Sequence, residues 1–79
     1  STKMEESFEK DYKLIGLNIS YYRRLRGLTQ TQLAEKIHIS PSYLSKIECG
    51  NYHKSVSLTT IIAIAYGLDV TIDKLLSSK

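Results

Sequence analysis

Residues 28–50 read LTQTQLAEKIHISPSYLSKIECG, and this stretch predicts two short helices joined by a tight turn. Thr29 is a favourable N-cap, and Gln32 three positions later completes the pattern of a capping box. Ser40 can cap the second helix, and the proline after it takes the first helical position, where a missing N–H costs nothing. Gly50 can end that helix in the left-handed conformation. The predicted arrangement is helix, tight turn, helix.

The two helices divide their residues between a buried stripe and an outer face. Helical spacing turns five apolar side chains inward: Leu33, Ala34, Ile37, Leu44 and Ile47. The outer face of the second helix then carries short hydroxyls and one cation: Pro41, Ser42, Ser45 and Lys46, with Tyr43 at its border. Serine can donate to or accept from base edges and lysine favours guanine acceptors, so this face suits a DNA major groove. The alternative is an ordinary surface at a helix end.

The wider pattern resembles the helix-turn-helix of phage repressor and Cro-like bacterial regulators, the XRE family. The matching residues are Leu-Thr-Gln-x-x-Leu-Ala-x-Lys-Ile, then Ile-Ser-x-Ser-Tyr-Leu-Ser-x-Ile-Glu-x-Gly, and the likeness runs from about residue 15 to 76. The resemblance implies an all-α fold, a compact five-helix bundle that is a lambda-repressor-like DNA-binding domain with the helix-turn-helix at helices 2 and 3. It also implies a dimeric transcription regulator.

Matched position by position, the resemblance assigns roles to single residues. Gln30 occupies the position that anchors the first motif helix to a phosphate. The base-facing positions are the outer-face residues given above, together with Ser40. Arg23 and Glu48 match a partly buried ion pair that ties the first helix of the domain to the recognition helix.

Two residues depart from the family pattern. His38 stands where the family usually has glycine, so the turn must hold a side chain in a strained backbone region. Cys49 stands where a polar residue is common, which removes a phosphate contact. As the single cysteine it allows no intramolecular disulfide, which suits a reducing cytoplasm. A redox-sensing thiol is the alternative to a passive one.

Positive charge is concentrated around the motif. The formal net charge is +3, but residues 23–54 carry +4 and residues 1–13 carry −1. A polyanion site requires such a concentration. We therefore predict that, beside Gln30, phosphates are held by Arg24, Arg26, Lys36, Asn51, His53 and Lys54. For the residues after Gly50 the alternative is a plain solvated loop.

Apolar periodicity predicts the first helix of the domain, which reaches about residue 26 and is ended by Gly27. Its inner stripe comprises Phe8, Tyr12, Ile15, Ile19 and Tyr22. A second apolar set lies on the other face: Leu14, Leu17, Tyr21 and Leu25. A helix that is apolar on two faces is buried on both or meets a partner, so Leu17 and Tyr21 are candidates for a dimer interface. Scattered surface apolar residues are the alternative.

The C-terminal part of the chain predicts two more helices. The fourth runs from Leu58 to about Tyr66, between a Ser57 cap and a Gly67 stop, and its core residues are Leu58, Ile61, Ile64, Ala65 and Leu68. Thr71 caps the last helix, in which Leu75 is buried. In the resembled family this region often pairs two subunits, so Ile62, Tyr66 and Ile72 are the leading dimer contacts. The alternative is an ordinary margin of the core.

Length and composition limit the remaining choices. At 79 residues the chain is one domain, with residues 1–7 as a disordered or expression-derived tail and residues 8–79 as the helix-turn-helix domain. No nucleophile–base pair, acid–base pair or metal spacing is visible, so we expect no enzyme, metal or cofactor. No stretch can span a membrane, and no signal peptide is seen. We expect a cytoplasmic, nucleoid-associated protein of a bacterium or phage.

The predicted function is sequence-specific binding of double-stranded DNA by a homodimer on an inverted-repeat operator, as a transcriptional regulator and repressor. The chain would be a self-sufficient small regulator or the DNA-binding part of a longer one. The alternative is a protein-interaction or antitoxin-type helical module that binds a partner protein. A toxin or RNA polymerase would be such a partner.

Overall fold

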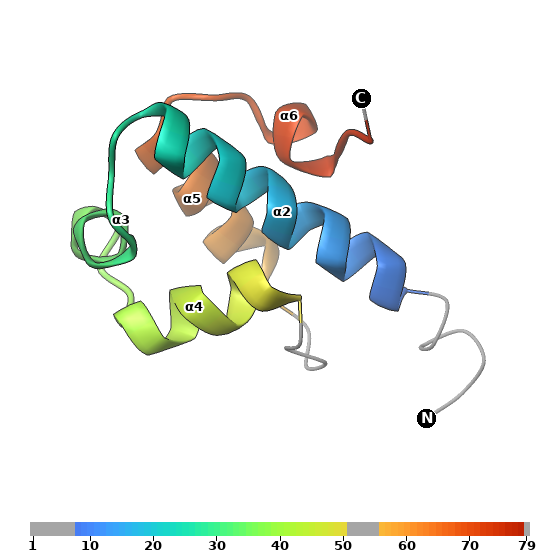
Figure 1. Ribbon diagram of the computed structural model, residues 1–79, viewed down its shortest axis with the longest axis horizontal. Helices are drawn as coiled ribbons and strands as arrows, with labels where there is room; N and C mark the ends of the chain where they lie inside the picture. The colour runs from blue at the N-terminus through green and yellow to red at the C-terminus, as the bar shows by residue number, and fades with distance from the viewer. Residues whose placement is uncertain (1–7, 51–55, 79) are drawn as a thin grey trace.

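The computed structural model describes residues 8–50 and 56–78, and this part of the chain is entirely helical. The helices in chain order are α2 (Glu9–Leu25), α3 (Gln30–Lys36), α4 (Pro41–Cys49), α5 (Leu58–Leu68) and α6 (Ile72–Leu76). In Figure 1 α2 crosses the middle of the molecule, with α4 below it, α6 above it, α3 at the left and α5 behind. The predicted all-α bundle is confirmed. The predicted tail at residues 1–7 lies outside the described residues.

The helix starts follow the capping pattern of the sequence. The Thr29 hydroxyl accepts from the Gln32 N–H at 3.0 Å, and the Gln32 side-chain oxygen accepts from the Thr29 N–H at 2.8 Å. The Ser40 hydroxyl accepts from the N–H of Tyr43 at 3.0 Å. These bonds satisfy backbone donors that a helix leaves without partners at its first turn, so α3 and α4 begin at fixed residues.

The core takes at least one fully buried large side chain from every described helix. These side chains are Ile19, Leu33, Leu44, Ile64, Leu68 and Leu75. Removing each from water stabilises the fold by about 1.5–3 kcal/mol before conformational entropy is subtracted. The four helices after α2 have 11 residues or fewer, a length that is marginal in isolation, and they are held together with α2 by one shared core.

Two predicted core residues are exposed. Phe8 is the N-cap residue of α2, and its side chain is 45% exposed. Leu58 is the first residue of α5, and it lies on one exposed stripe with Ile62 and Tyr66. The periodicity was correct for most of both helices, but it does not reveal which side chains at the helix starts are left exposed.

Gly67 does not end α5, contrary to the sequence expectation. The helix continues through Leu68, and Asp69 takes the left-handed C-cap position at φ 58°. A Cβ on Gly67 would lie 2.6 Å from Cγ2 of Ile37, so this glycine allows α5 to pack closely on the end of α3. At the next helix, Thr71 occupies the N-cap position of α6 but makes no side-chain capping bond.

A second glycine, Gly16, permits close packing of α2 on α4. It is buried within α2, and a Cβ there would lie 2.6 Å from the backbone oxygen of Ile47 and would also clash with that of Glu48. A rigid carbonyl cannot move aside as a flexible side chain can. Gly16 therefore sets the spacing between α2 and the C-terminal half of α4.

Candidate nucleic-acid interface

Helix α4 is fixed on its inner side and open on its outer side. Leu44 and Ile47 are buried, as predicted, and form the inner stripe. Of the predicted base-facing residues, Ser40, Pro41, Ser42 and Lys46 are exposed, and Tyr43 and Ser45 are half-buried. The structure thus brings all six onto one helix and its cap. Hydroxyls and an ammonium group on such a face can donate to and accept from base edges.

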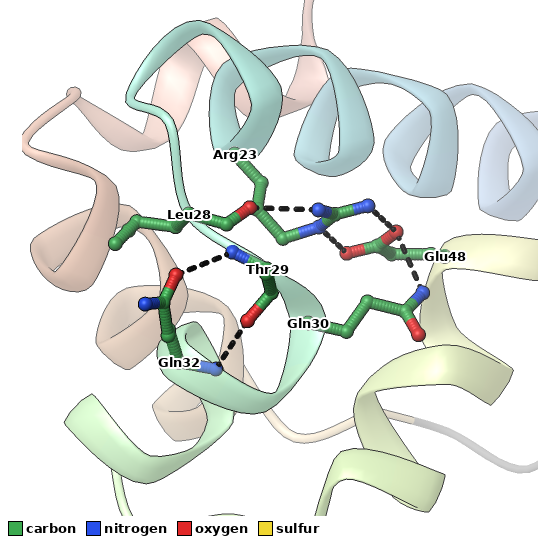
Figure 2. A network of polar contacts seen from close by, with 6 residues as sticks. All are labelled: Arg23, Leu28, Thr29, Gln30, Gln32 and Glu48. Carbon is green, nitrogen blue, oxygen red and sulfur yellow. Dashed lines mark hydrogen bonds and ion pairs between the residues drawn. The ribbon is translucent and has the colours of Figure 1, made fainter.

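A buried polar network joins α2, α3 and α4 (Figure 2). Arg23 donates from Nε to Glu48 Oε2 at 2.7 Å and from Nη2 to Oε1 at 3.1 Å. Its Nη1 donates to the backbone oxygen of Leu28 at 2.8 Å. Gln30 Nε2, at the first position of α3, donates to the same Glu48 Oε1 at 3.0 Å. A single carboxylate on α4 therefore holds side chains from the two neighbouring helices.

The network is well satisfied, because the two charged side chains are only 10% and 6% exposed and each has several partners. Among the described residues no buried side-chain nitrogen or oxygen lacks a hydrogen bond. A buried ion pair is costly to desolvate, and its value lies in fixing one arrangement of the groups that it joins. Here it fixes the orientation of α4 relative to α2 and α3.

The turn between α3 and α4 holds the strained residue that the sequence predicted. His38 has φ 63° and lies in the left-handed region, with its side chain exposed. The turn is closed by a hydrogen bond of 3.0 Å from the Ile39 N–H to the Ala34 oxygen. The left-handed conformation costs a residue with a Cβ roughly 1–2 kcal/mol. The turn therefore stores strain between the two motif helices.

Two of the predicted phosphate-binding cations have other partners. Arg26 donates from Nε to the Leu68 oxygen at 2.8 Å and from Nη2 to the Asp69 oxygen at 3.1 Å. Lys36 Nζ donates to the Gly67 oxygen at 2.9 Å. These carbonyls form the C-terminal end of α5, where the helix dipole favours positive charge. The structure thus gives Arg26 and Lys36 a role in capping α5, and their assignment to DNA phosphates stays a prediction.

Arg24 also lies away from the motif. It follows Arg23, which faces α4, and one residue turns an α-helix by about 100°. Arg24 is exposed on the side of α2 that carries Leu17 and Tyr21. Within residues 8–50 and 56–78, Lys46 is the predicted DNA-binding cation that lies on the outer face of α4. Asn51, His53 and Lys54 lie outside the described residues.

Three positioning features were missed by the sequence analysis. Gly16 could have been found from the sequence, since a glycine within a long amphipathic helix indicates that another helix approaches it closely. The hydrogen bond from Gln30 to Glu48 has no sequence signal, because the two residues are distant in the chain. Asn18 donates from Nδ2 to the oxygens of Leu75 and Ser77 at 2.8 and 2.9 Å, and this link from α2 to the end of α6 has no sequence signature either.

Other kinds of site find little support in the described part of the chain. Residues 8–50 and 56–78 contain no group of three His, Cys, Asp or Glu that could hold a metal ion. Cys49 is a free, exposed thiol at the last position of α4. Every helix in these two ranges is too short or too polar to cross a bilayer.

Comparison with known proteins identifies similar regulators. A helix-turn-helix family model matches residues 19–75. The immunity repressor protein of Bacillus phage phi105 is 44% identical over 57 residues, covering 72% of this chain and 40% of that protein. SinR, an HTH-type transcriptional regulator of Bacillus subtilis, is 36% identical over 66 residues, covering 84% of this chain and 59% of that protein. The chain thus spans about half the length of these curated relatives.

Solved structures share the fold. The restriction-modification controller protein C.AhdI from Aeromonas hydrophila aligns with a TM-score of 0.76 at 30% identity, over 84% of this chain and 97% of that one. The clp gene regulator ClgR from C. glutamicum aligns with a TM-score of 0.74 at 29% identity, over 82% of each chain.

Proposed function

Because this chain belongs to the helix-turn-helix family, we propose that it binds double-stranded DNA sequence-specifically and regulates transcription as a repressor. One observation carries this proposal: α4 is held from behind by buried side chains and an ion pair, while its outer face presents Ser42 and Lys46 to solvent, with Ser45 half-buried beside them. The names of the similar phage immunity repressor and of SinR support a regulatory role.

In the proposed complex α4 enters the major groove. Ser42, Ser45 and Lys46 contact base edges, since hydroxyls can donate or accept and an ammonium group donates to guanine O6 and N7. Ser40 and Pro41 bring the start of the helix to the groove, where recognition helices contact base edges with their first residues. Tyr43, at the border of the face, packs on the sugar–phosphate backbone or on a thymine methyl group.

Phosphate contacts position α4 in the groove. Gln30 is half-buried beside Glu48, which orients its amide group at the start of α3. In the proposal this amide group contacts a phosphate, and Asn51, His53 and Lys54, which follow α4 in the sequence, contact others. Each neutralised phosphate releases counterions, so affinity falls steeply as salt rises.

A homodimer on an inverted repeat is the form of the protein that we propose. Helix α5 contains no charged residue, and Leu58, Ile62 and Tyr66 form an exposed stripe along it. Ile62 and Tyr66 are 44% and 87% exposed and line a groove of about 350 Å³ between α5 and α3. Lys36 also lines this groove, and its ammonium group is bonded to the Gly67 oxygen. The α5 stripe itself is uncharged, so it can pair with its own copy without bringing like charges together. Ile72 is half-buried against the core and would contribute only at the edge.

The two-fold axis of such a dimer would place the recognition helices in successive major grooves, about 34 Å apart. The test of dimerisation is sedimentation velocity at micromolar concentration. The Ile62→Ser/Tyr66→Ser variant should sediment as a monomer, whereas a Leu17→Ser/Tyr21→Ser variant, changed on α2, should behave as the wild type. A wild-type monomer would contradict this part of the proposal.

The test of DNA recognition is fluorescence anisotropy with the region upstream of the protein's own gene. The Ser42→Ala/Lys46→Ala variant should lose preference for that DNA over scrambled DNA. The matched control is Lys74→Ala, which removes an exposed cation from α6 instead of α4. Unchanged preference in the double variant would refute the assignment of α4 as the reading helix.

A further inference from the structure

A second apolar surface lies between α2 and α6, away from both α4 and the α5 stripe. It is a groove of about 360 Å³ whose floor includes Leu14, Leu17 and Tyr21. Leu17 and Tyr21 are 65% and 54% exposed. Together with Leu25 they continue at helical spacing along most of α2. An exposed apolar stripe of this length on a small domain indicates an interaction surface.

The groove has a fixed wall. The Asn18 amide donates to the backbone oxygens of Leu75 and Ser77, and these two bonds hold the end of α6 against α2. Tyr21 and Tyr22 pack edge to face with their ring centroids 5.0 Å apart, which orients the Tyr21 ring at the floor. Because the end of α6 and the Tyr21 ring are already held in place, a ligand would not have to order them when it binds.

The charges at this groove are positive. Lys74 is the single lysine, arginine, aspartate or glutamate among the residues that line it. Lys10 lies one turn before Leu14 on α2, and Arg24 lies one turn after Tyr21, so both extend the same face of the helix. Glu9 and Asp11, which flank Lys10, point to either side of that face, because successive helical residues are about 100° apart.

This charge pattern is unfavourable for a second copy of the chain. In a parallel pairing of two α2 helices, Lys10 would meet Lys10 and Arg24 would meet Arg24. In an antiparallel pairing centred on Leu17, Lys10 of one copy would approach Arg24 of the other. Both arrangements bring like charges together, whereas an acidic partner would meet opposite charge at both ends of the stripe and at Lys74.

We propose that the α2–α6 groove binds an amphipathic, acidic helix of a partner protein. The apolar stripe of that helix would pack on Leu14, Leu17 and Tyr21. Its acidic residues would pair with Lys10, Arg24 and Lys74. An apolar helix face in a preformed groove is a recurring mode of peptide recognition. The groove and α4 lie against different faces of α2, because Gly16 and Arg23 contact α4 whereas Asn18 bonds to the end of α6. In Figure 1 the two helices α4 and α6 lie on opposite sides of α2. The partner can therefore bind while α4 is occupied.

The experiment uses three designed helical peptides and labelled wild-type protein. All three carry leucines at helical spacing, and their polar positions are glutamate, glutamine or lysine. Amide NMR signals are followed up to about 1 mM peptide. The glutamate peptide should shift signals of residues 14–21 and 74–78, leave those of residues 62–66 unchanged, and bind roughly tenfold more tightly than the lysine peptide.

Variants separate the surface from the fold. Lys10→Glu/Arg24→Glu changes exposed residues only. This variant should bind the glutamate peptide about tenfold more weakly than the wild type does, and its own far-UV circular dichroism spectrum should match that of the wild type. Ile62→Ser/Tyr66→Ser, on α5, should bind the peptide as the wild type does.

Four results would overturn the proposal. They are the absence of shifts in the groove, equal binding of the glutamate and lysine peptides, self-association that Leu17→Ser/Tyr21→Ser abolishes, and binding of phosphatidylserine vesicles through the groove in place of peptide. None of these measurements involves DNA, so failure here and failure of the DNA-binding proposal can be told apart.

Discussion

Arg23 and Glu48 meet between α2 and α4, with Arg23 Nε 2.7 Å from Glu48 Oε2 and Nη2 3.1 Å from Oε1. The same carboxylate accepts from Gln30, so three helices converge on one acid. This pairing was expected from the family resemblance, but the contribution of α3 was not. The acid thereby links the helix that we propose reads DNA to both helices behind it.

Glu48→Ala should destabilise the protein severely, because it leaves the Arg23 guanidinium buried without its acid. The expected loss is roughly 3–5 kcal/mol of unfolding free energy, measured by urea denaturation. Arg23→Met/Glu48→Leu removes both charges and should be clearly more stable than Glu48→Ala. If the double variant were as unstable as the single one, the loss could not come from an unpaired charge.

Gly16→Ala should cost about 1–3 kcal/mol, because the added methyl group meets the Ile47 carbonyl and must push α4 away from α2. Gly27→Ala is the matched control: it has open space around a Cβ, and its φ of 72° adds only backbone strain. Because the Gly16 methyl group meets two rigid carbonyl oxygens, its loss in urea denaturation should lie at the upper end of this range, above the roughly 1–2 kcal/mol of backbone strain that Gly27→Ala costs. The reverse order would contradict the close approach of α2 and α4.

His38→Gly should stabilise the protein by about 0.5–1 kcal/mol, because the relief of left-handed strain exceeds the entropy cost of glycine. The melting temperature should rise by a few degrees for a domain of this size. His38→Ala removes the same imidazole but keeps a Cβ at φ 63°, so it should show no gain. Equal gains in both variants would trace the effect to the imidazole and not to the backbone.

Lys36→Ala and Arg26→Ala should lower stability without changing DNA recognition. Each removes a cation from the C-terminal carbonyls of α5, which is worth roughly 0.3–1 kcal/mol at a surface position. The dependence of DNA affinity on salt should keep its slope in both variants, because neither side chain contacts a phosphate in the proposal. If the slope of log affinity against log salt concentration fell by about one in a variant, the replaced side chain would be shown to contact a phosphate.

Lys46→Ala should weaken binding to the cognate site by roughly 1–3 kcal/mol and relax the preference at one base pair. The reason is that its ammonium group is the exposed cation at the middle of the α4 outer face. Affinities for single-base variants of the site, measured by anisotropy, give both quantities. A uniform loss across all sequences would mean that Lys46 contacts a phosphate instead of a base.

Much of the fold could be predicted because its signals are local. The Thr29 and Ser40 caps, the left-handed Gly50 and the buried stripe of α4 depend on residues within one or two turns of one another. The five-helix architecture came from the family resemblance. Leu58 and Gly67 were misassigned because their surroundings are decided by which helix packs beside them.

The candidate site was less predictable, for the same physical reason. Counting charges along residues 23–54 predicted a basic site, but it could not show where each side chain points. Arg26 and Lys36 cap α5, a helix that begins more than twenty residues later in the sequence. A long flexible cation takes the nearest acceptor in space, and only the tertiary structure shows which acceptor that is.

The two sides of α4 are separate: Leu44, Ile47 and Glu48 attach the helix to the domain, and the exposed Ser42 and Lys46 do not. The exposed positions should therefore accept the corresponding residues of another regulator without loss of folding. Retargeting this protein to a new operator would then be a matter of grafting side chains onto a scaffold that stays the same.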